Sequence, residues 1–168
     1  MAGADLTVVD ISKESLRICQ ERFKVYGQSA KFYCGNAEEL SSIVPVERYD
    51  LIYSFGVIHH TPHPEKVFAE IRKYCTPETE IRVMLYSKWS WKVFWIIMTY
   101  GKGAFWHAKE LIRTYSEAQK GCPVTYCYSF KDIRRQMSGC KIIDMRKEHI
   151  FPFVIKKYAN YEYQWVWY

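Results

Sequence analysis

Three segments of this chain each pair a short apolar run with a side chain that could bind a ligand or move a proton. The first run is LTVV, which Asp10 follows directly, and the second is KFYC, which Gly35 and Asn36 follow. The third is YDLIYS, which ends at Ser54 just before a loop with three histidines. Such runs predict buried strands, and open parallel sheets bind ligands beyond the carboxyl ends of their strands. We therefore expect one ligand site formed by residues at these three positions.

Asp10 and Asn36 each allow two interpretations. The two carboxylate oxygens of Asp10 match the adjacent hydroxyls of a ribose, but an acidic residue also stabilises the start of a following helix. Asn36 follows Gly35, so its amide could contact an adenine edge, yet a Gly-Asn pair also favours a plain turn. The residue types alone leave both alternatives open.

The loop after Ser54 contains His59 and His60, either of which could act as a general base. Together with His63 they raise the question of a metal site. No carboxylate or thiol nearby completes a plausible set of ligands, so we expect no metal.

The elements that must position these residues alternate between strands and helices. This alternation predicts an α/β fold with a mostly parallel sheet and right-handed crossovers. The expected strands are residues 6–10, 31–34, 49–54, 80–86 and 140–147. The first expected helix begins after a cap at Ser12 and ends near Gly27. The others cover residues 37–42, 65–75, 109–119 and 130–137, the last of them capped by Ser129.

Composition narrows the class of protein. The 168 residues are 49% hydrophobic and 17% aromatic, which favours one globular domain over a disordered chain. The net charge is +6, but the basic residues are scattered, so we expect no nucleic-acid partner. Residues 1–9 lack the parts of a secretory signal, and the six cysteines show no metal spacing. We therefore expect a cytoplasmic protein with reduced thiols.

Residues 89–106 are unusually aromatic and allow two alternatives. The unbroken apolar run 93–98 is far too short to span a bilayer, so no integral membrane segment is expected. The segment could form a helical cover over the substrate side of the sheet. It could also form a membrane-surface helix, since Lys88, Lys92 and Lys102 flank it. The short run and polar neighbours favour the cover.

The three segments, in this order and spacing, resemble the class I S-adenosylmethionine-dependent methyltransferases. GADLTVVDIS resembles their second-strand segment, and AKFYCGNAEEL is similar to their next motif, usually Gly-Asp-Ala-Glu. YDLIYSFGVIHHTPHPEKVFAEIRKYCTPETEIRVMLY resembles the pair of strands that follows. The resemblance covers residues 3–87. It implies a Rossmann-like seven-stranded fold, with helices on both faces of the sheet and strand order 3-2-1-4-5-7-6.

The resemblance also implies a cofactor and a reaction. The implied S-adenosylmethionine-binding residues are Asp10, Ile11, Asn36, Ala37, Ser54 and Phe55. The first pair would hold the ribose hydroxyls and flank the adenine, the second would contact the adenine edge, and the third would lie beside the methionine portion. Methyl transfer to a small-molecule acceptor would be an in-line displacement from the sulfonium. His59 or His60 would remove a proton from the acceptor.

The sequence departs from the family at both ends. The family's first strand and its Gly-X-Gly-X-Gly loop would precede Ala2, and the family's last antiparallel strand would follow the aromatic tail. We therefore expect an incomplete single domain, with a cofactor-binding core at 1–87, a helical substrate-side cover at 88–138, and a strand and tail at 139–168. Exposed sheet edges predict self-association. The alternative functions are a non-catalytic binding or scaffold fragment and a peripheral membrane protein.

Overall fold

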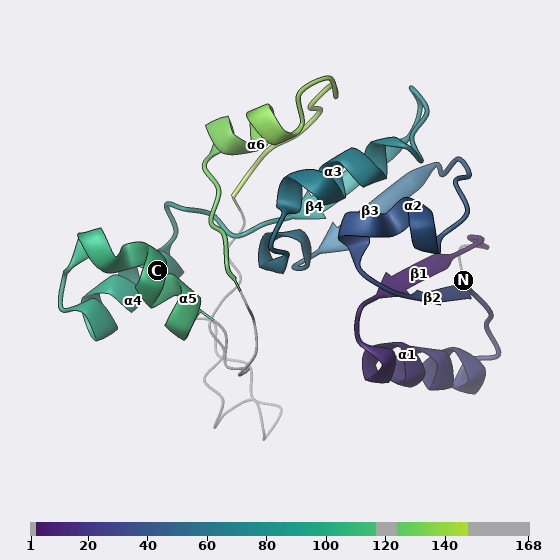
Figure 1. Cartoon of the computed structure of the whole chain (residues 1–168), viewed down its shortest axis with the longest axis horizontal. Helices are drawn as coiled ribbons and strands as arrows, with labels where there is room; N and C mark the ends of the chain where they lie inside the picture. Colours follow the sequence, from purple (N-terminus) through teal and green to yellow (C-terminus); the bar gives the residue numbers. More distant parts are fainter. Residues whose placement is uncertain (1–2, 117–123, 148–168) are drawn as a thin grey trace. The chain divides into compact units, whose positions relative to one another are not determined.

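The computed structural model describes residues 3–116 and 124–147 (Figure 1). Within this part the chain divides into two compact units. The first contains residues 3–86 and 124–127, and the second contains residues 87–116 and 128–147. The strands and the predicted site residues all belong to the first unit.

The first strand pair of this unit is β1 (Thr7–Asp10) and β2 (Lys31–Cys34). They run parallel, with Thr7 opposite Lys31 and Asp10 opposite Cys34. Helix α1 (Lys13–Val25) connects them and lies along one face (Figure 1). Its first turn is capped by Ser12, whose hydroxyl accepts a hydrogen bond from the Ser15 amide. Parallel pairing brings the ends of β1 and β2 to the same edge.

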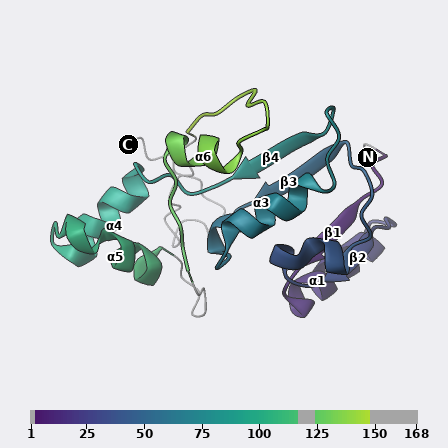
Figure 2. The same cartoon turned by 45° about the horizontal axis from the view of Figure 1, so that its top comes forward.

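The second strand pair is β3 (Leu51–Phe55) and β4 (Glu80–Met84), also parallel. Helix α3 (Pro64–Arg72) connects them and lies along one face of the pair (Figure 2). Its apolar stripe of Val67, Phe68 and Ile71 is buried and forms the main core of the unit. The short helices η1 (Ala37–Glu39) and α2 (Leu40–Ile43) pack beside α3.

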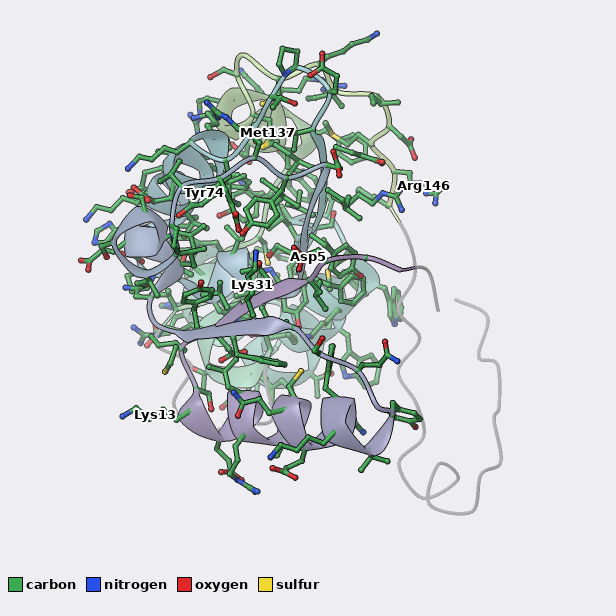
Figure 3. All side chains as sticks on the ribbon, turned by 90° about the vertical axis from the view of Figure 1, so that its right-hand side faces the viewer. Asp5, Lys13, Lys31, Tyr74, Met137 and Arg146 are labelled. Atoms are coloured by element: carbon green, nitrogen blue, oxygen red, sulfur yellow. The ribbon has the colours of Figure 1, made fainter. Side chains whose placement is uncertain are left out.

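In the described residues no ladder of backbone hydrogen bonds joins β1 to β3, so the two pairs are separate sheets. Side chains connect them instead. The Tyr49 hydroxyl lies 3.1 Å from Thr7 Oγ1, and the Lys31 ammonium lies 3.4 Å from Glu47, which precedes β3 in the chain. Lys31 also lies 3.5 Å from Asp5, on its own side of the unit (Figure 3). The pairs β1–β2 and β3–β4 match neighbours in the strand order that the resemblance implies. That order has a further strand between them, which is not among the described residues.

The prediction of a strand at residues 140–147 is wrong. Residues 141–147 have no regular secondary structure, and Ile143 is 84% exposed. A strand needs a partner for its backbone groups, and no described strand pairs with this segment. The pattern Cys-Lys-Ile-Ile-Asp-Met has strand propensity, but propensity alone does not produce a strand.

The second unit consists of helices. Helix α4 (Trp91–Gly101) packs against α5 (Ala108–Tyr115), and the short helix η3 (Phe105–His107) lies between them in the chain. Ile96, Ile97 and Ile112 are buried, and the rings of Tyr100 and Tyr115 stack at 4.0 Å. Helix α6 (Phe130–Gln136) begins with the predicted cap at Ser129, which forms a capping box with Asp132.

Candidate cofactor and catalytic site

Asp10 is the last residue of β1 and is half-buried. Its Oδ1 atom accepts a hydrogen bond from the Ser12 amide at 2.7 Å, in the turn that leads into α1. This contact agrees with the helix-start interpretation. Within residues 3–116 and 124–147, Oδ2 receives no hydrogen bond, so the carboxylate keeps acceptor capacity for a ligand hydroxyl. The two interpretations of Asp10 are therefore compatible.

Asn36 lies at the same edge, after β2, and caps η1. Its side-chain oxygen accepts from the Glu38 amide at 3.0 Å. The side-chain oxygen of Asn36 already accepts one hydrogen bond within this turn, so an adenine amino group would compete with the Glu38 amide for it. Ala37 begins η1 beside it, and the exposed Ile11 lies across the edge, where its carbonyl accepts from the Cys34 thiol at 3.7 Å.

Gly35 has a packing role rather than an evident ligand role. A Cβ atom at this position would lie 2.4 Å from Cδ1 of Ile43 and 3.0 Å from its Cγ1. The side chain of Ile43 therefore occupies the space that a larger residue at position 35 would need. The structure brings Asp10, Ile11, Asn36 and Ala37 together at one sheet edge, with Gly35 holding the turn between them.

Ser54 and Phe55 end β3, which is paired with β4 and not with β1. Phe55 is exposed and its ring stacks on Tyr53 at 6.0 Å with an interplanar angle of 8°. The strand is followed by Gly56, whose φ of +77° lies in the left-handed region that glycine adopts without strain. This third position therefore stands on a separate sheet from the first two.

The two adjacent histidines have different surroundings. His59 is fully buried at 0% exposure, and its ring lies 4.0 Å from that of Tyr86 and 4.1 Å from that of His60. His60 is half-buried, with Nδ1 3.3 Å from the Val124 carbonyl and 3.3 Å from the Thr125 hydroxyl. This geometry favours His60 over His59 as a group that could meet a substrate.

The segment 124–126 contacts the histidine loop, and the sequence did not predict this contact. The Tyr126 amide donates to the His59 carbonyl at 2.9 Å, and the Tyr126 hydroxyl donates to the Pro62 carbonyl at 3.2 Å. No local pattern in Val-Thr-Tyr indicates a contact with a loop more than 60 residues earlier. His63 points elsewhere, with Nδ1 3.3 Å from Glu65.

Two sequence comparisons relate the first unit to methyltransferases. The family model for a methyltransferase domain matches residues 1–82. The ubiquinone biosynthesis O-methyltransferase of Photobacterium profundum is 29% identical over 79 residues. The match covers 47% of this chain and 33% of that enzyme, so the chain spans only part of its relative.

Solved structures share the fold. The YcgJ protein of Bacillus subtilis superimposes with a TM-score of 0.60 at 16% identity, covering 80% of this chain and 51% of that one. The BH2331 protein of Bacillus halodurans C-125, a candidate methyltransferase, gives 0.56 at 15% identity, covering 81% and 52%. These matches confirm the resemblance to class I methyltransferases and the Rossmann-like α/β fold. No helix in the described ranges is long and apolar enough to cross a membrane.

Proposed function

We propose that the protein containing this chain transfers a methyl group from S-adenosylmethionine to a small molecule. The observation that carries this proposal is the clustering of Asp10, Ile11, Asn36 and Ala37 at the carboxyl edge of β1 and β2. That edge is where open parallel sheets bind nucleotide-like ligands. The family match over residues 1–82 supports methyl transfer in general, and the cofactor and acceptor are our inference.

The residues of this edge suit the adenosine portion of the cofactor. The Asp10 carboxylate offers Oδ2 to ribose hydroxyls while Oδ1 is fixed by the Ser12 amide. The exposed Ile11 offers an apolar surface for the adenine face, and the η1 turn at Asn36 and Ala37 borders the adenine edge. Ser54 and Phe55 would border the methionine portion. The cofactor, when bound, supplies a sulfonium-activated methyl group, and holding it in line with the acceptor is the protein's main contribution.

His60 is the general base in this proposal. Its Nδ1 atom lies within reach of the Val124 carbonyl, which can only accept, so we assign the Nδ1 proton to the neutral ring. Nε2 is then the basic atom that takes a proton from the acceptor. His59, which is fully buried against Tyr86, supports the ring of His60 rather than meeting the acceptor.

The nucleophilic atom of the methyl acceptor is inferred from one relative. The relative from Photobacterium profundum is named an O-methyltransferase, which supports an oxygen nucleophile for this protein as well. We also propose that the acceptor is a small molecule, that the protein is cytoplasmic and that it has no nucleic-acid partner.

Cofactor binding tests the proposal directly. Titrate the 168-residue chain with S-adenosylmethionine by calorimetry up to millimolar concentration, and compare Asp10→Asn with the matched control Asp5→Asn, which changes an exposed carboxylate just before β1. We expect saturable binding that Asp10→Asn weakens about 10- to 100-fold, the scale of a charge-assisted hydrogen bond. Asp5→Asn should bind like the unmodified chain. Binding that is absent, or equal in both variants, contradicts the cofactor site.

A non-catalytic binding fragment is the second candidate, and the separation of β1–β2 from β3–β4 in the described residues favours it. The methionine-side residues then lack the sheet continuity that would align them with the adenosine-side residues. Incubation with methyl-labelled cofactor and a set of phenolic acceptors separates the two functions. Labelled product that disappears in His60→Asn supports the enzyme, and binding without any product supports the fragment.

A further inference from the structure

Helix α4 has two apolar faces: within the described residues one packs against α5, and the other is partly exposed. Ile96 and Ile97 are each 3% exposed and belong to the face that packs against α5. The opposite face carries residues at positions i, i+3, i+4 and i+7, which form one continuous stripe along a helix. The α4 stripe consists of Trp91, Phe94, Trp95 and Met98, which are 44%, 42%, 55% and 46% exposed.

The surroundings of the α4 stripe are aromatic as well. Trp89, Phe105 and Trp106 flank the helix and are all exposed. Residues 87–109 contain four of the six tryptophans in the protein. Exposed apolar residues scattered singly need no explanation, but a contiguous set of this size indicates an interaction surface. Tryptophan is also the residue type that suits a surface with an apolar and a wet side.

The distribution of charged residues indicates what kind of partner the α4 stripe would bind. Residues 87–109 contain four lysines and no aspartate or glutamate. The described second unit, residues 87–116 and 128–147, has eleven basic (Lys, Arg) and three acidic residues. The described first unit, residues 3–86 and 124–127, has ten basic and twelve acidic residues. The positive charge of the described chain is therefore concentrated on the unit that carries the stripe, and it favours an anionic partner.

We propose that the α4 stripe is a membrane-surface site that binds an anionic lipid bilayer. The exposure of the stripe thus favours the membrane-surface alternative over the substrate-side cover that the sequence favoured. With 11 residues, α4 is about 16 Å long, too short to cross a bilayer and suited to lying in its interface. The stripe would enter the boundary between headgroups and acyl chains. Lys88, Lys92 and Lys102 would meet lipid phosphates. This inference rests on other residues than the proposed catalytic function and is independent of it.

A nucleic acid is also anionic, but the make-up of the stripe argues against it. Aromatic side chains that stack on bases stand along a basic groove, whereas the α4 stripe includes Met98 and runs continuously along one helix face. Lipid is therefore the partner that fits both the apolar stripe and its lysines.

Vesicle co-sedimentation of the 168-residue chain tests this proposal. Use vesicles of phosphatidylcholine alone and of phosphatidylcholine with about one-third phosphatidylglycerol, at low and high salt. Compare Trp95→Glu with Ile18→Glu, a half-exposed apolar residue on α1 of the first unit, and check folding by circular dichroism. We expect binding to the anionic vesicles that salt weakens, that Trp95→Glu reduces at least about tenfold, and that Ile18→Glu leaves unchanged.

Three outcomes overturn the proposal. The first is no preference for anionic vesicles over neutral ones. The second is equal vesicle binding by Trp95→Glu and Ile18→Glu. The third is evidence that the stripe binds a nucleic acid or a second copy of the chain. In that case Trp95→Glu would abolish binding to a short single-stranded DNA, or would convert a dimer into a monomer in size exclusion, and would leave vesicle binding unchanged.

Discussion

The Nδ1 atom of His60 lies 3.3 Å from the hydroxyl oxygen of Thr125, a residue 65 positions later in the chain. Thr125 is buried, and the neighbouring Val124 carbonyl contacts the same nitrogen. Two groups from one distant segment thus fix the orientation of the histidine proposed as the base. The position of this ring depends on tertiary structure and not on the loop alone.

We expect Thr125→Val to lower the free energy of unfolding by about 1 kcal/mol, because it removes the buried hydroxyl that contacts His60 while keeping the volume of the side chain. Urea denaturation of the variant and the unmodified chain measures this difference. Thr99→Val, at an exposed position of α4, is the control and should change stability by less than about 0.5 kcal/mol. Equal effects of the two substitutions would mean that the contact with His60 contributes nothing.

A second prediction concerns the link between the two strand pairs. The hydroxyl of Tyr49 lies 3.1 Å from Thr7 Oγ1 and 2.8 Å from Glu47, and burial raises the pKa of Tyr49, so it stays a donor at neutral pH. Tyr49→Phe should lower the free energy of unfolding by about 1 kcal/mol. Tyr26→Phe, at an exposed position, should have no measurable effect. In a double-mutant cycle with Thr7→Val, additive losses would rule out coupling through this bond.

A third prediction concerns pH and Glu70, whose side chain is 13% exposed. Burial disfavours its charged form, but hydrogen bonds from Lys73 and Ser41 outweigh burial, so the pKa of Glu70 lies below its usual value. A lowered folded-state pKa stabilises the fold above the unfolded pKa, about 4.3, and this stabilisation is lost as pH falls through the folded pKa. Glu70→Gln should therefore lower the free energy of unfolding by about 1–2 kcal/mol at pH 7.

At about pH 3.5 the difference between Glu70→Gln and the unmodified chain should be smaller, because this pH lies below the unfolded pKa of about 4.3 and the unfolded chain then binds the proton that the folded state disfavours. Glu78→Gln, at an exposed turn position, is the matched control for the loss of one acidic charge. A difference for Glu70→Gln that stays constant between neutral and acidic pH would show that the charged form contributes no stability.

The sequence predicted those features that depend on local chemistry. Ser12 and Ser129 marked the starts of α1 and α6, and both cap their helices through the side-chain oxygen. The strands at 31–34 and 49–54 were correct within two residues at each end. The strand at 140–147 failed because a strand forms only with a partner, which composition does not reveal. The contact of Thr125 with His60 could not be predicted, because no periodicity connects residues 65 positions apart.

The final prediction concerns the affinity of the 168-residue chain for S-adenosylmethionine, which we expect to be saturable but weak. The adenosine-side residues follow β1 and β2, whereas Ser54 and Phe55 end β3, which belongs to a separate sheet. Without backbone pairing between β1 and β3, part of the binding free energy is spent on ordering the two halves of the site. The dissociation constant should therefore exceed ~10 µM, about 7 kcal/mol of binding free energy.

No other part of the described chain replaces this alignment. A glycine-rich turn after a strand would let backbone amides approach the cofactor, but Gly101 and Gly103 lie at the end of helix α4 instead. The facing edges of β1 and β3 also leave backbone groups open to other strands, so we expect concentration-dependent association. Calorimetry with S-adenosylmethionine, run alongside size exclusion at several protein concentrations, measures both effects. A monomer at all concentrations with low-micromolar affinity would show that the separate strand pairs already form a complete cofactor site.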